Sequence, residues 1–400
     1  MHLMSCDSTS FEPLSSSSDE TRQRSALEKG VVPETVVKEI NAEEDNIKEE
    51  TELIKGSNSN IKSKAKSEKY IANLRAIQNS EKLDIKTIQF SLLFYVLLFL
   101  TSKYINSSFQ VFYQLSYNYP NDDNSYDIGL NDIYFTIFWI INLIFLRSFL
   151  IIYLFKPCAK LLGIKKFVAT QRFIEQSWSI IYYVLSWGFG FYLYYKSDYF
   201  FNCYNIYANW PHDKLSSEFK FYYLVQTANW FQQCIVIFLE ARRKDHIQMV
   251  SHHIITILLC TGSYISYFTR IGHIILLIMD IVDVFLSGAK VLKYCGFQTI
   301  CDVMFVIFML VWIILRHGVY VYVLWFSWIK ARDIMDMNCA KFLPGQFVKA
   351  CYTDFQIDFL LILLAFLQII MCIWMYMILR VAIRVISGGP ADDVRSDSEE

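Results

Sequence analysis

Long apolar stretches alternate with polar connections along most of the chain after residue 85. About eight such stretches run approximately over 87–105, 133–155, 178–195, 221–239, 249–268, 271–292, 300–328 and 355–379. A helix needs about 20 predominantly apolar residues to cross a bilayer, and most of these stretches reach that length. The pattern therefore predicts an all-α polytopic membrane protein with about eight transmembrane helices. Because the first and third stretches are short or rich in aromatic residues, the predicted number of transmembrane helices ranges from about seven to nine.

Composition supports this interpretation because the charges are segregated. The 400 residues are 54% hydrophobic, 17% aromatic and only 19% charged, and polar residues concentrate at the two ends of the chain. Residues 1–80 hold too little apolar surface to offset the entropy of ordering, so we expect a disordered tail there. A second, acidic tail is expected over 388–400. The formal net charge of −1 argues against nucleic acid as a partner.

Lysine and arginine residues in the short connections predict the orientation in the membrane. One side receives Lys156, Lys160, Lys165, Lys166, Arg172, Arg242, Arg243, Lys244, Lys290 and Lys293, and the opposite side receives fewer. Because cytosolic connections carry the excess of positive charge, the first side is cytosolic, and both termini fall there too. The first 20 residues are Ser-rich and acidic without an apolar core, so we expect the first span to direct insertion in place of a cleaved signal peptide.

Three further features concern covalent modification. Asn106-Ser107-Ser108 is an N-glycosylation sequon that lies very close to the predicted membrane. Serines beside acidic residues at 15–20 and 396–400 are typical of phosphorylation sites, and equally of solubilising tails. Cys339 and Cys351 fall in one predicted lumenal connection, and the spacing leaves open both a disulfide and two unpaired thiols.

Polar and ionisable residues recur at helical spacing inside three consecutive apolar stretches. The stretch at 249–268 carries His252, His253, Thr256, Cys260 and Ser263; the next carries His273, Asp280, Asp283 and Ser287; the preceding one carries Gln226, Trp230 and Gln233. Ionisable groups inside a membrane are costly and by default mark function. Spacings of three, four and seven residues place each set on one helix face. We therefore expect three helices to present polar faces to a shared cavity, although the glutamines also suit interhelical hydrogen bonds alone.

The histidine pair and Asp283 are expected at similar depth. The short turn around Arg270 makes their two stretches antiparallel, and at about 1.5 Å per residue His252 lies roughly 25 Å and Asp283 about 20 Å from that turn. An imidazole is a natural general base at neutral pH, and a neighbouring carboxylate orients it. Without an activated serine or cysteine beside it, such a pair suits attack on an already activated acyl donor. The histidine either deprotonates an incoming amine or alcohol or carries the acyl group itself.

Basic residues at the predicted cytosolic mouth suggest what the donor carries. The run Arg242–Lys244 lies two turns before the histidines and suits the phosphates of a coenzyme A thioester. The same run is also a common topology signal. Arg147, Arg316 and His317 lie within apolar stretches and either line the cavity or support the structure.

The same residues resemble the signature of a known family. Arg242-Arg243-Lys244-Asp245-His246, His252-His253, Asp280-Ile281-Val282-Asp283 and Ala289-Lys290 look like the motif of the ceramide synthases in the TRAM–longevity-assurance (TLC) family. The resemblance is strongest to fungal members. It implies a TLC-type helical bundle or barrel that encloses an intramembrane cavity. The chain then comprises a tail at 1–80, two transmembrane helices and a cytosolic connection at 81–166, a catalytic TLC domain at 167–387 and a tail at 388–400.

The resemblance implies an enzyme that transfers a fatty acyl group from acyl-coenzyme A to the amine of a sphingoid base, forming ceramide or dihydroceramide. The candidate catalytic residues are His252, His253, Asp280 and Asp283, and the candidate substrate-binding residues are Arg242, Arg243, Lys244, Gln226, Trp230 and Gln233. Acyl-coenzyme A is a co-substrate, so neither a cofactor nor a metal is implied. The resemblance places the protein in the endoplasmic reticulum membrane, among membrane lipids and beside a small single-span subunit, and leaves a dimer open. Acyl-chain choice in the family depends on a lumenal connection and channel shape, here around 329–352.

Two other functions fit parts of the pattern. A di-metal hydroxylase or desaturase uses clustered histidines, but it needs several His-rich boxes, and only His246, His252, His253 and His273 fall near each other. A non-enzymatic TLC-domain lipid transporter or sensor shares the architecture. The presence of both the histidine pair and the two aspartates argues against that second function.

Overall fold

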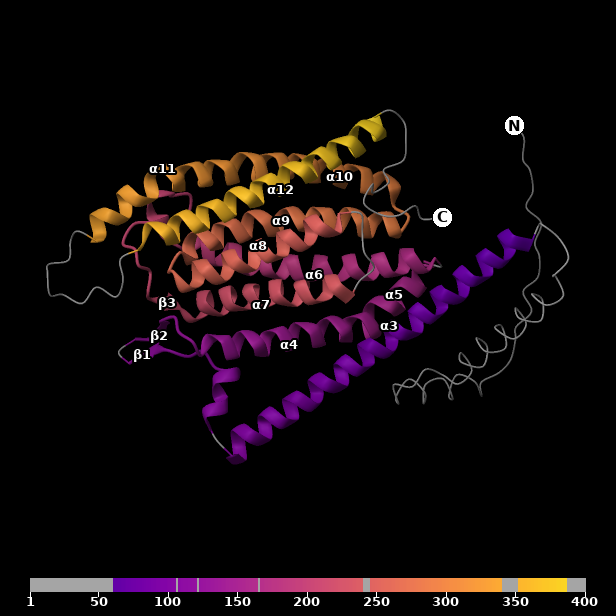
Figure 1. The fold of residues 1–400 in the computed structure, drawn as a ribbon, viewed down its shortest axis with the longest axis horizontal. Helices are drawn as coiled ribbons and strands as arrows, with labels where there is room; N and C mark the ends of the chain where they lie inside the picture. Colours follow the sequence, from indigo (N-terminus) through magenta and orange to yellow (C-terminus); the bar gives the residue numbers. More distant parts are fainter. Residues whose placement is uncertain are drawn as a thin grey trace, which may run out of the picture. The chain divides into compact units, whose positions relative to one another are not determined.

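The computed structural model describes residues 60–105, 107–120, 122–164, 166–239, 245–339 and 352–386, and these residues form mostly helix (Figure 1). The chain divides into two compact units, Met1–Ile85 and Lys86–Glu400, and the candidate site belongs to the second. Helix α3 (Asn60–Leu100) begins inside the tail predicted over 1–80, because residues after Asn60 are rich in the good helix formers lysine and alanine. The predicted tails at 1–59 and 388–400 lie outside the described residues.

Most of the second unit consists of long helices. They are α4 (Asp132–Leu150), α5 (Lys156–Leu161), α6 (Phe167–Tyr195), α7 (Ser217–Leu239), α8 (His246–Ile265), α9 (Thr269–Tyr294), α10 (Gln298–Trp312), α11 (Tyr320–Cys339) and α12 (Asp354–Ile386). Short 3₁₀ or π segments are η1 (Thr101–Ile105), η2 (Ser107–Phe112), η3 (Ile151–Phe155), η4 (Tyr204–Ile206) and η5 (Ile313–Val319). Segment η3 joins α4 to α5, and η5 joins α10 to α11. Each pair of helices therefore forms one continuous helical stretch.

Each predicted apolar stretch coincides with a helix. Among the described residues, four helical stretches are long and apolar enough to cross a membrane: Ser80–Tyr104, Asp132–Leu161, Gln298–Asp336 and Asp354–Arg384. Helices α6 to α9 are between 20 and 29 residues long, which corresponds to roughly 30–44 Å. They are long enough, but their polar residues lower their apolar character. These residues build the candidate site.

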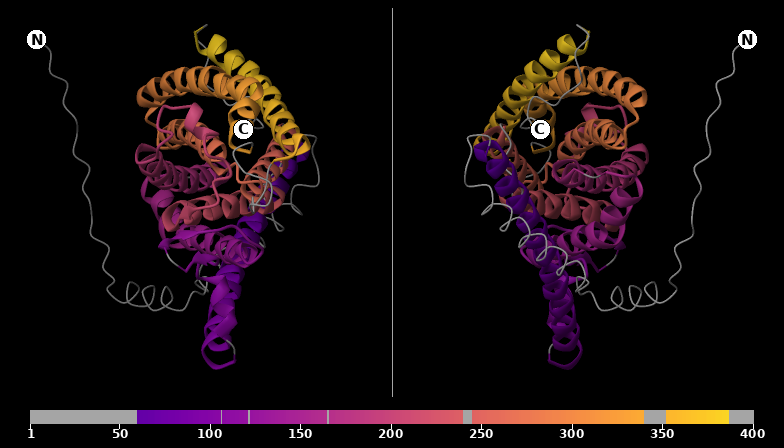
Figure 2. Two further views of the ribbon diagram at one scale, coloured as in Figure 1. Left: turned by 90° about the vertical axis from the view of Figure 1, so that its left-hand side faces the viewer. Right: turned by 90° about the vertical axis from the view of Figure 1, so that its right-hand side faces the viewer.

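Helices α6 to α12 form a closed ring, shown end-on in Figure 2. Going round the ring, α6 contacts α7, α7 contacts α8, α8 contacts α12, and α12 contacts α11. Through η5 and α10 the ring returns to α9, which packs along α6. The three helices with predicted polar faces are therefore close together. Helix α8 contacts both α7 and α9, and α6 also contacts both of them. Helix α4 packs against α7 from outside the ring.

Apolar side chains hold the ring together in three clusters. The largest joins α9 to α10, α11 and α12, with Val282, Tyr320 and Met335 fully buried at its centre. A second cluster joins η3 and α5 to α6 around Ala159 and Ile174. The third joins α7 to α8 and α9. Burial of about 25 cal/mol per Å² of apolar surface stabilises soluble cores, but inside a membrane the close packing itself holds helices together.

A small sheet and a buried ion pair close one end of the bundle. Strands β1 (Asn118–Tyr119), β2 (Asp122–Tyr126) and β3 (Leu215–Ser216) form an antiparallel sheet in that order. The fully buried Lys220 of α7 forms an ion pair with Asp132 of α4, with 2.8 Å between Nζ and Oδ1.

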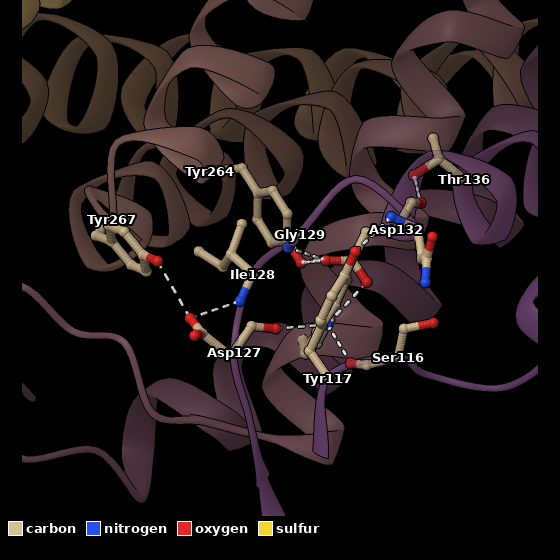
Figure 3. A network of polar contacts seen from close by, with 11 residues as sticks. Ser116, Tyr117, Asp127, Ile128, Gly129, Asp132, Thr136, Tyr264 and Tyr267 are labelled. Atoms are coloured by element: carbon tan, nitrogen blue, oxygen red, sulfur yellow. Dashed lines mark hydrogen bonds and ion pairs between the residues drawn. The ribbon is translucent and has the colours of Figure 1, made fainter. Parts of the chain in front are cut away.

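Hydrogen bonds extend this pair into a wider network. Lys220 also donates to the carbonyls of Ser116 and Asp127. Asp132 accepts from the Tyr264 hydroxyl at 2.9 Å and from the Gly129 amide at 3.0 Å (Figure 3). The network ties residues 116–132 to α7 and α8. The sequence pattern predicts only a connection here.

Candidate active site between the helices

The two adjacent histidines of α8 point in different directions. Successive helix residues are rotated by about 100°, so neighbouring side chains diverge. The buried His253 places Nδ1 2.7 Å from the Met249 carbonyl. Because a carbonyl only accepts, Nδ1 carries the proton and Nε2 keeps a free lone pair. Nδ1 of His252 has no hydrogen-bond partner among the described residues. Both rings therefore retain a nitrogen that is available for proton or acyl transfer.

Tryptophans fix the orientation of these imidazoles. The Trp230 ring of α7 packs edge-on against His252 and His253, with centroids 5.3 and 5.5 Å away. The Trp374 ring of α12 also packs edge-on against His252, with 5.2 Å between the ring centroids. Aromatic pairs prefer such edge-to-face geometry. The sequence predicts Trp230 as a site residue, but nothing in the mostly apolar last stretch marks Trp374.

Asp280 lies in a buried hydrogen-bond network between α6, α7 and α9. Its Oδ2 accepts from Gln226 Nε2 at 2.6 Å and from the Ser186 hydroxyl at 2.9 Å. The Gln226 amide oxygen accepts from Tyr182 at 2.9 Å. Asp280 and Gln226 are each 1% exposed. The structure therefore places Gln226 against Asp280, where it lines neither of the two cavities described below. Ser186 and Tyr182 sit in an aromatic-rich stretch that gave no polar signal.

Asp283 forms an ion pair with Arg316, one of the residues whose role the sequence leaves open. Arg316 donates to Asp283 Oδ1 at 2.9 Å and to the Met279 carbonyl at 3.0 Å. Its guanidinium lies 4.2 Å from the centroid of the Trp312 ring. Arg316 belongs to the π segment η5, a type of irregularity frequent at functional sites. No hydrogen bond joins Asp283 to either histidine in the described part of the chain, although all three line one cavity.

Two cavities meet at His252 and Trp230. The first is apolar and is lined by the remaining predicted residues of the α8 face, Thr256, Cys260 and Ser263, together with leucines and isoleucines of α9 and α12. The second is polar and is lined by His253, Asp283, Ser287, Gln233, Lys290, Arg147, Arg316 and Glu175, among others. Counting the space at their open ends, they enclose about 750 and 1340 Å³. Both cavities are lined by His252 and by Trp230.

The polar cavity collects more cationic than anionic groups. Arg147, Lys290 and Arg316 line it, against the acids Glu175 and Asp283. Arg147 comes from α4, so a helix outside the ring contributes to this wall. Arg242, Arg243 and Lys244, predicted at the mouth, lie outside the described residues. Gln233 lines the cavity and donates to the Tyr183 hydroxyl at 3.1 Å.

Two other histidines lie away from the histidine pair: His273, which the sequence places on the polar face of α9, and His317, whose role the sequence leaves open. His273 accepts from the Tyr199 hydroxyl at Nδ1, 2.7 Å away, and its Nε2 donates to the Gly190 carbonyl at 3.0 Å. It is fully buried and supports the packing of α9 on α6. His317 accepts from Trp312 Nε1 at 3.1 Å. Within the described residues there is no group of three or more histidines, cysteines, aspartates or glutamates placed to hold a metal ion.

Comparison with known proteins agrees with the class that this fold and site define, a multi-pass membrane protein with a polar centre between its helices. The TLC domain of the TRAM–LAG1–CLN8 family matches residues 172–380. The chain belongs to this family.

Several fungal relatives share most of their length with the chain. It is 37% identical over 306 residues to the sphingosine N-acyltransferase-like protein ALT7 of Alternaria alternata, covering 70% of this chain and 71% of the relative. It is 40% identical over 286 residues to the sphingosine N-acyltransferase lag1 of Schizosaccharomyces pombe, covering 71% and 72%. It is 36% identical over 292 residues to the ceramide synthase LAG1 of Saccharomyces cerevisiae, covering 72% and 69%.

Proposed function

We propose that this protein is a ceramide synthase that transfers a fatty acyl group from acyl-coenzyme A to the amine of a sphingoid base. The observation that carries the proposal is the position of His252, whose side chain lines both the apolar and the polar cavity. An acyl thioester is itself apolar at one end and polar at the other. The names of the relatives support the same activity.

The two cavities suit the two halves of the donor. The acyl tail extends along α8 in the apolar cavity, from His252 past Cys260 to Ser263, a distance of about 16 Å for 11 residues. The nucleotide end lies toward the polar cavity, where Arg147, Lys290 and Arg316 complement phosphate charge. The basic run Arg242–Lys244, predicted at the mouth from the sequence, would add further positive charge. The thioester carbon then lies beside the imidazoles.

The histidines supply proton transfer or acyl transfer at this point. In the first route, an imidazole nitrogen takes a proton from the sphingoid amine while the amine nitrogen attacks the thioester carbon. The C–S bond then breaks, and the proton passes from the imidazole to the departing thiolate. In the second route, the imidazole nitrogen attacks the thioester carbon first, and the C–S bond breaks to release the thiolate. The imidazole carries the acyl group until the amine nitrogen displaces it, and the amine proton passes to the thiolate. His253 is poised for the first role because its protonated Nδ1 is anchored to Met249.

The two aspartates have separate roles in this proposal. Asp283, on the wall of the polar cavity with Arg316, stabilises the positive charge that develops on a histidine. Asp280 positions α9 relative to α6 and α7 through Gln226 and Ser186. It therefore acts through the scaffold, because it lies behind the cavity wall. Trp230 holds both imidazoles in place.

We further propose that eight helices span the endoplasmic reticulum membrane, with both termini in the cytosol. The lengths of α6 to α9 and the distribution of basic residues in the connections support this topology. The mouth of the polar cavity then faces the cytosol. The proposed reaction consumes only acyl-coenzyme A and the sphingoid base, so it requires neither a cofactor nor a metal. The resemblance to fungal members supports a small single-span membrane subunit as a partner of this protein.

A turnover assay tests this function. Membranes that contain the protein are incubated with a labelled sphingoid base and a panel of acyl-coenzyme A donors, and ceramide is counted against the amount of protein. Many turnovers per chain are expected, with one donor length preferred. Binding of both substrates with no product, also in the presence of a fungal single-span subunit, would leave the lipid transporter or sensor as the better function.

A further inference from the structure

A pocket with three cationic side chains lies at the other end of the ring from the polar cavity. The polar cavity involves the beginning of α6 and the end of α9, whereas this pocket lies at the end of α6 and the beginning of α9. Lys196, Lys214 and Arg270 line it, and Glu218 is the one acid among its lining residues. In the topology proposed above, it faces the lumen. Neither the predicted site residues nor the proposed reaction uses it.

The first turn of α9 contributes Thr269 and Arg270 to the lining of this pocket. Helix α9 begins at Thr269, and its preceding residue, Phe268, gives no side-chain cap. The first amides of a helix have no partners within the helix, and the helix dipole makes this end positive. Together these properties favour an anion. A helix start alone is common, so further groups must decide whether a ligand fits.

Two buried polar atoms in the pocket have no partner among the residues that the structure describes. They are the hydroxyl of Thr269, a residue that is 0% exposed, and Nδ1 of His212, a residue that is 9% exposed. Both residues line the pocket. Buried polar atoms are nearly always hydrogen-bonded, because leaving one unpaired costs about 1–3 kcal/mol. Their presence beside an uncapped helix start indicates that the pocket receives a polar ligand.

The three cations remain able to face such a ligand. Lys196 donates to the Tyr192 hydroxyl at 2.5 Å, which leaves two of its three donors. The Lys214 ammonium lies over the Tyr119 ring, 5.6 Å from the centroid. Arg270 pairs with Asp198 at 3.0 Å, so its net contribution is smaller.

We propose that this pocket binds a phosphate group, supplied either as free phosphate or as the headgroup of a phospholipid in the adjacent leaflet. The hydroxyl of Thr269 and the first amides of α9 donate to phosphate oxygens, and Lys196 and Lys214 balance the charge. His212 donates Nε2–H to the Ala208 carbonyl at 2.9 Å, so its Nδ1 accepts from a protonated phosphate oxygen. Exposed tyrosines at the end of α6, Tyr192 and Tyr195, are of the type that lies at headgroup level.

Thermal unfolding of the purified full-length protein in detergent tests the proposal. Inorganic phosphate is titrated against sodium chloride of equal ionic strength. The wild type is expected to show a saturable rise in Tm with phosphate. In the Lys196→Gln/Lys214→Gln variant the half-saturating phosphate concentration rises by roughly tenfold or more, because two charge-assisted contacts are lost. Lys103→Gln, an exposed lysine away from the pocket, serves as the matched control and keeps the wild-type response.

A second arm distinguishes the source of the phosphate. The same variants are placed in nanodiscs made with or without an anionic phospholipid. Stabilisation by the anionic lipid, but not by free phosphate, assigns the pocket to a headgroup; stabilisation by free phosphate alone assigns it to a soluble anion. If the double variant responds like the wild type in both arms, the phosphate acts elsewhere, for example in the polar cavity, and the proposal is wrong.

Thr269→Val provides an independent check that does not alter charge. If nothing binds, removing an unpaired buried hydroxyl leaves the protein equally or more stable. If phosphate binds there, the variant loses stability relative to the wild type only when phosphate or anionic lipid is present. A variant that is more stable under both conditions would contradict the proposal. None of these measurements depends on acyl transfer, so they stand apart from the proposed function.

Discussion

Arg316 connects η5 to α9 by donating to both the Asp283 carboxylate and the Met279 carbonyl, at 2.9 and 3.0 Å. The pair is mostly buried, with 5% of the Arg316 side chain and 22% of the Asp283 side chain exposed. One guanidinium therefore fixes the wall of the polar cavity next to the histidines.

Replacement of Arg316 tests this connection. Arg316→Met leaves Asp283 without its charged partner, and we expect a loss of about 2 kcal/mol in the free energy of unfolding together with a large loss of acyl transfer. Arg316→Lys keeps the charge but lacks the planar guanidinium, whose Nη2 donates to both acceptors and which packs over Trp312. An intermediate activity is therefore expected. Ceramide formation and Tm are measured on equal amounts of inserted protein. Wild-type values for Arg316→Met would show that the pair has no role.

Gln226 is predicted to act through Asp280. Gln226→Leu removes one of the two hydrogen bonds to Asp280 Oδ2 and leaves the carboxylate less satisfied, at a cost of about 1–3 kcal/mol. Activity should fall in parallel with stability, without a change in the KM for either substrate. Ser186→Ala removes the other hydrogen bond and should give a similar, smaller effect. A selective rise in KM for Gln226→Leu would instead place the glutamine in contact with substrate.

The apolar cavity should set the preferred acyl length. Ile271 lines it near the beginning of α9, at the end away from His252. Ile271→Trp shortens the space, so the preferred donor should become shorter while turnover with short donors persists. Ile271→Leu, of equal volume, should keep the wild-type preference. The measurement is the relative rate across a series of acyl-coenzyme A donors, and an unchanged profile for the tryptophan variant would place the acyl tail elsewhere.

The ion pair of Lys220 and Asp132 should be structural. Removing one partner of a buried pair costs about 3–5 kcal/mol because the other charge is left uncompensated. Lys220→Met should therefore lower Tm strongly. Adding Asp132→Asn should recover part of the loss, because the asparagine is neutral and still accepts from Tyr264. Additive losses in the double variant would indicate that the two charges are not coupled.

His212 should make stability depend on pH. Burial, assisted by the charge of Arg270, lowers the pKa of His212 to about 4. The unfolded chain, with its ordinary pKa near 6.5, then binds more protons between these values. Its contribution to stability is complete above about pH 6.5 and is lost as the pH falls toward 4. Comparing Tm between pH 5 and 8 in phosphate-free buffer should show a flatter profile for His212→Gln, and identical slopes would contradict this assignment.

The helices and much of the site follow from sequence pattern. Apolar runs of membrane length identify the helices, and the expensive polar residues within them identify the faces of α7, α8 and α9. His252, His253 and Asp283 do meet in one cavity. Periodicity alone, however, cannot tell a residue on the cavity wall from one bonded behind it. Asp280 shares the face of Asp283 along α9 yet is bonded to α6 and α7.

Other features depend on packing that leaves no local signal. The π turn at η5 shifts the register of the helix, so the direction of Arg316 could not be read from a regular helical repeat. Trp374 and Ser186 occupy stretches whose remaining residues are almost all apolar or aromatic. Helix α12 contributes lining residues to both cavities, and its contact with α8 is not marked in the sequence. The pairing of Lys220 with Asp132 leaves no local signal, because the two residues are far apart in sequence.

The most direct measurement of the central claim is ceramide formation by the His252→Ala/His253→Ala variant in membranes, with its insertion and amount matched to the wild type. Ser251→Ala, on the same helix but outside both cavities, is the control. We predict that the double variant loses at least about a hundredfold in rate, the contribution expected from a positioned acid–base group, while the control stays near the wild type. Undiminished ceramide output from the double variant would contradict an active site at the junction of the two cavities.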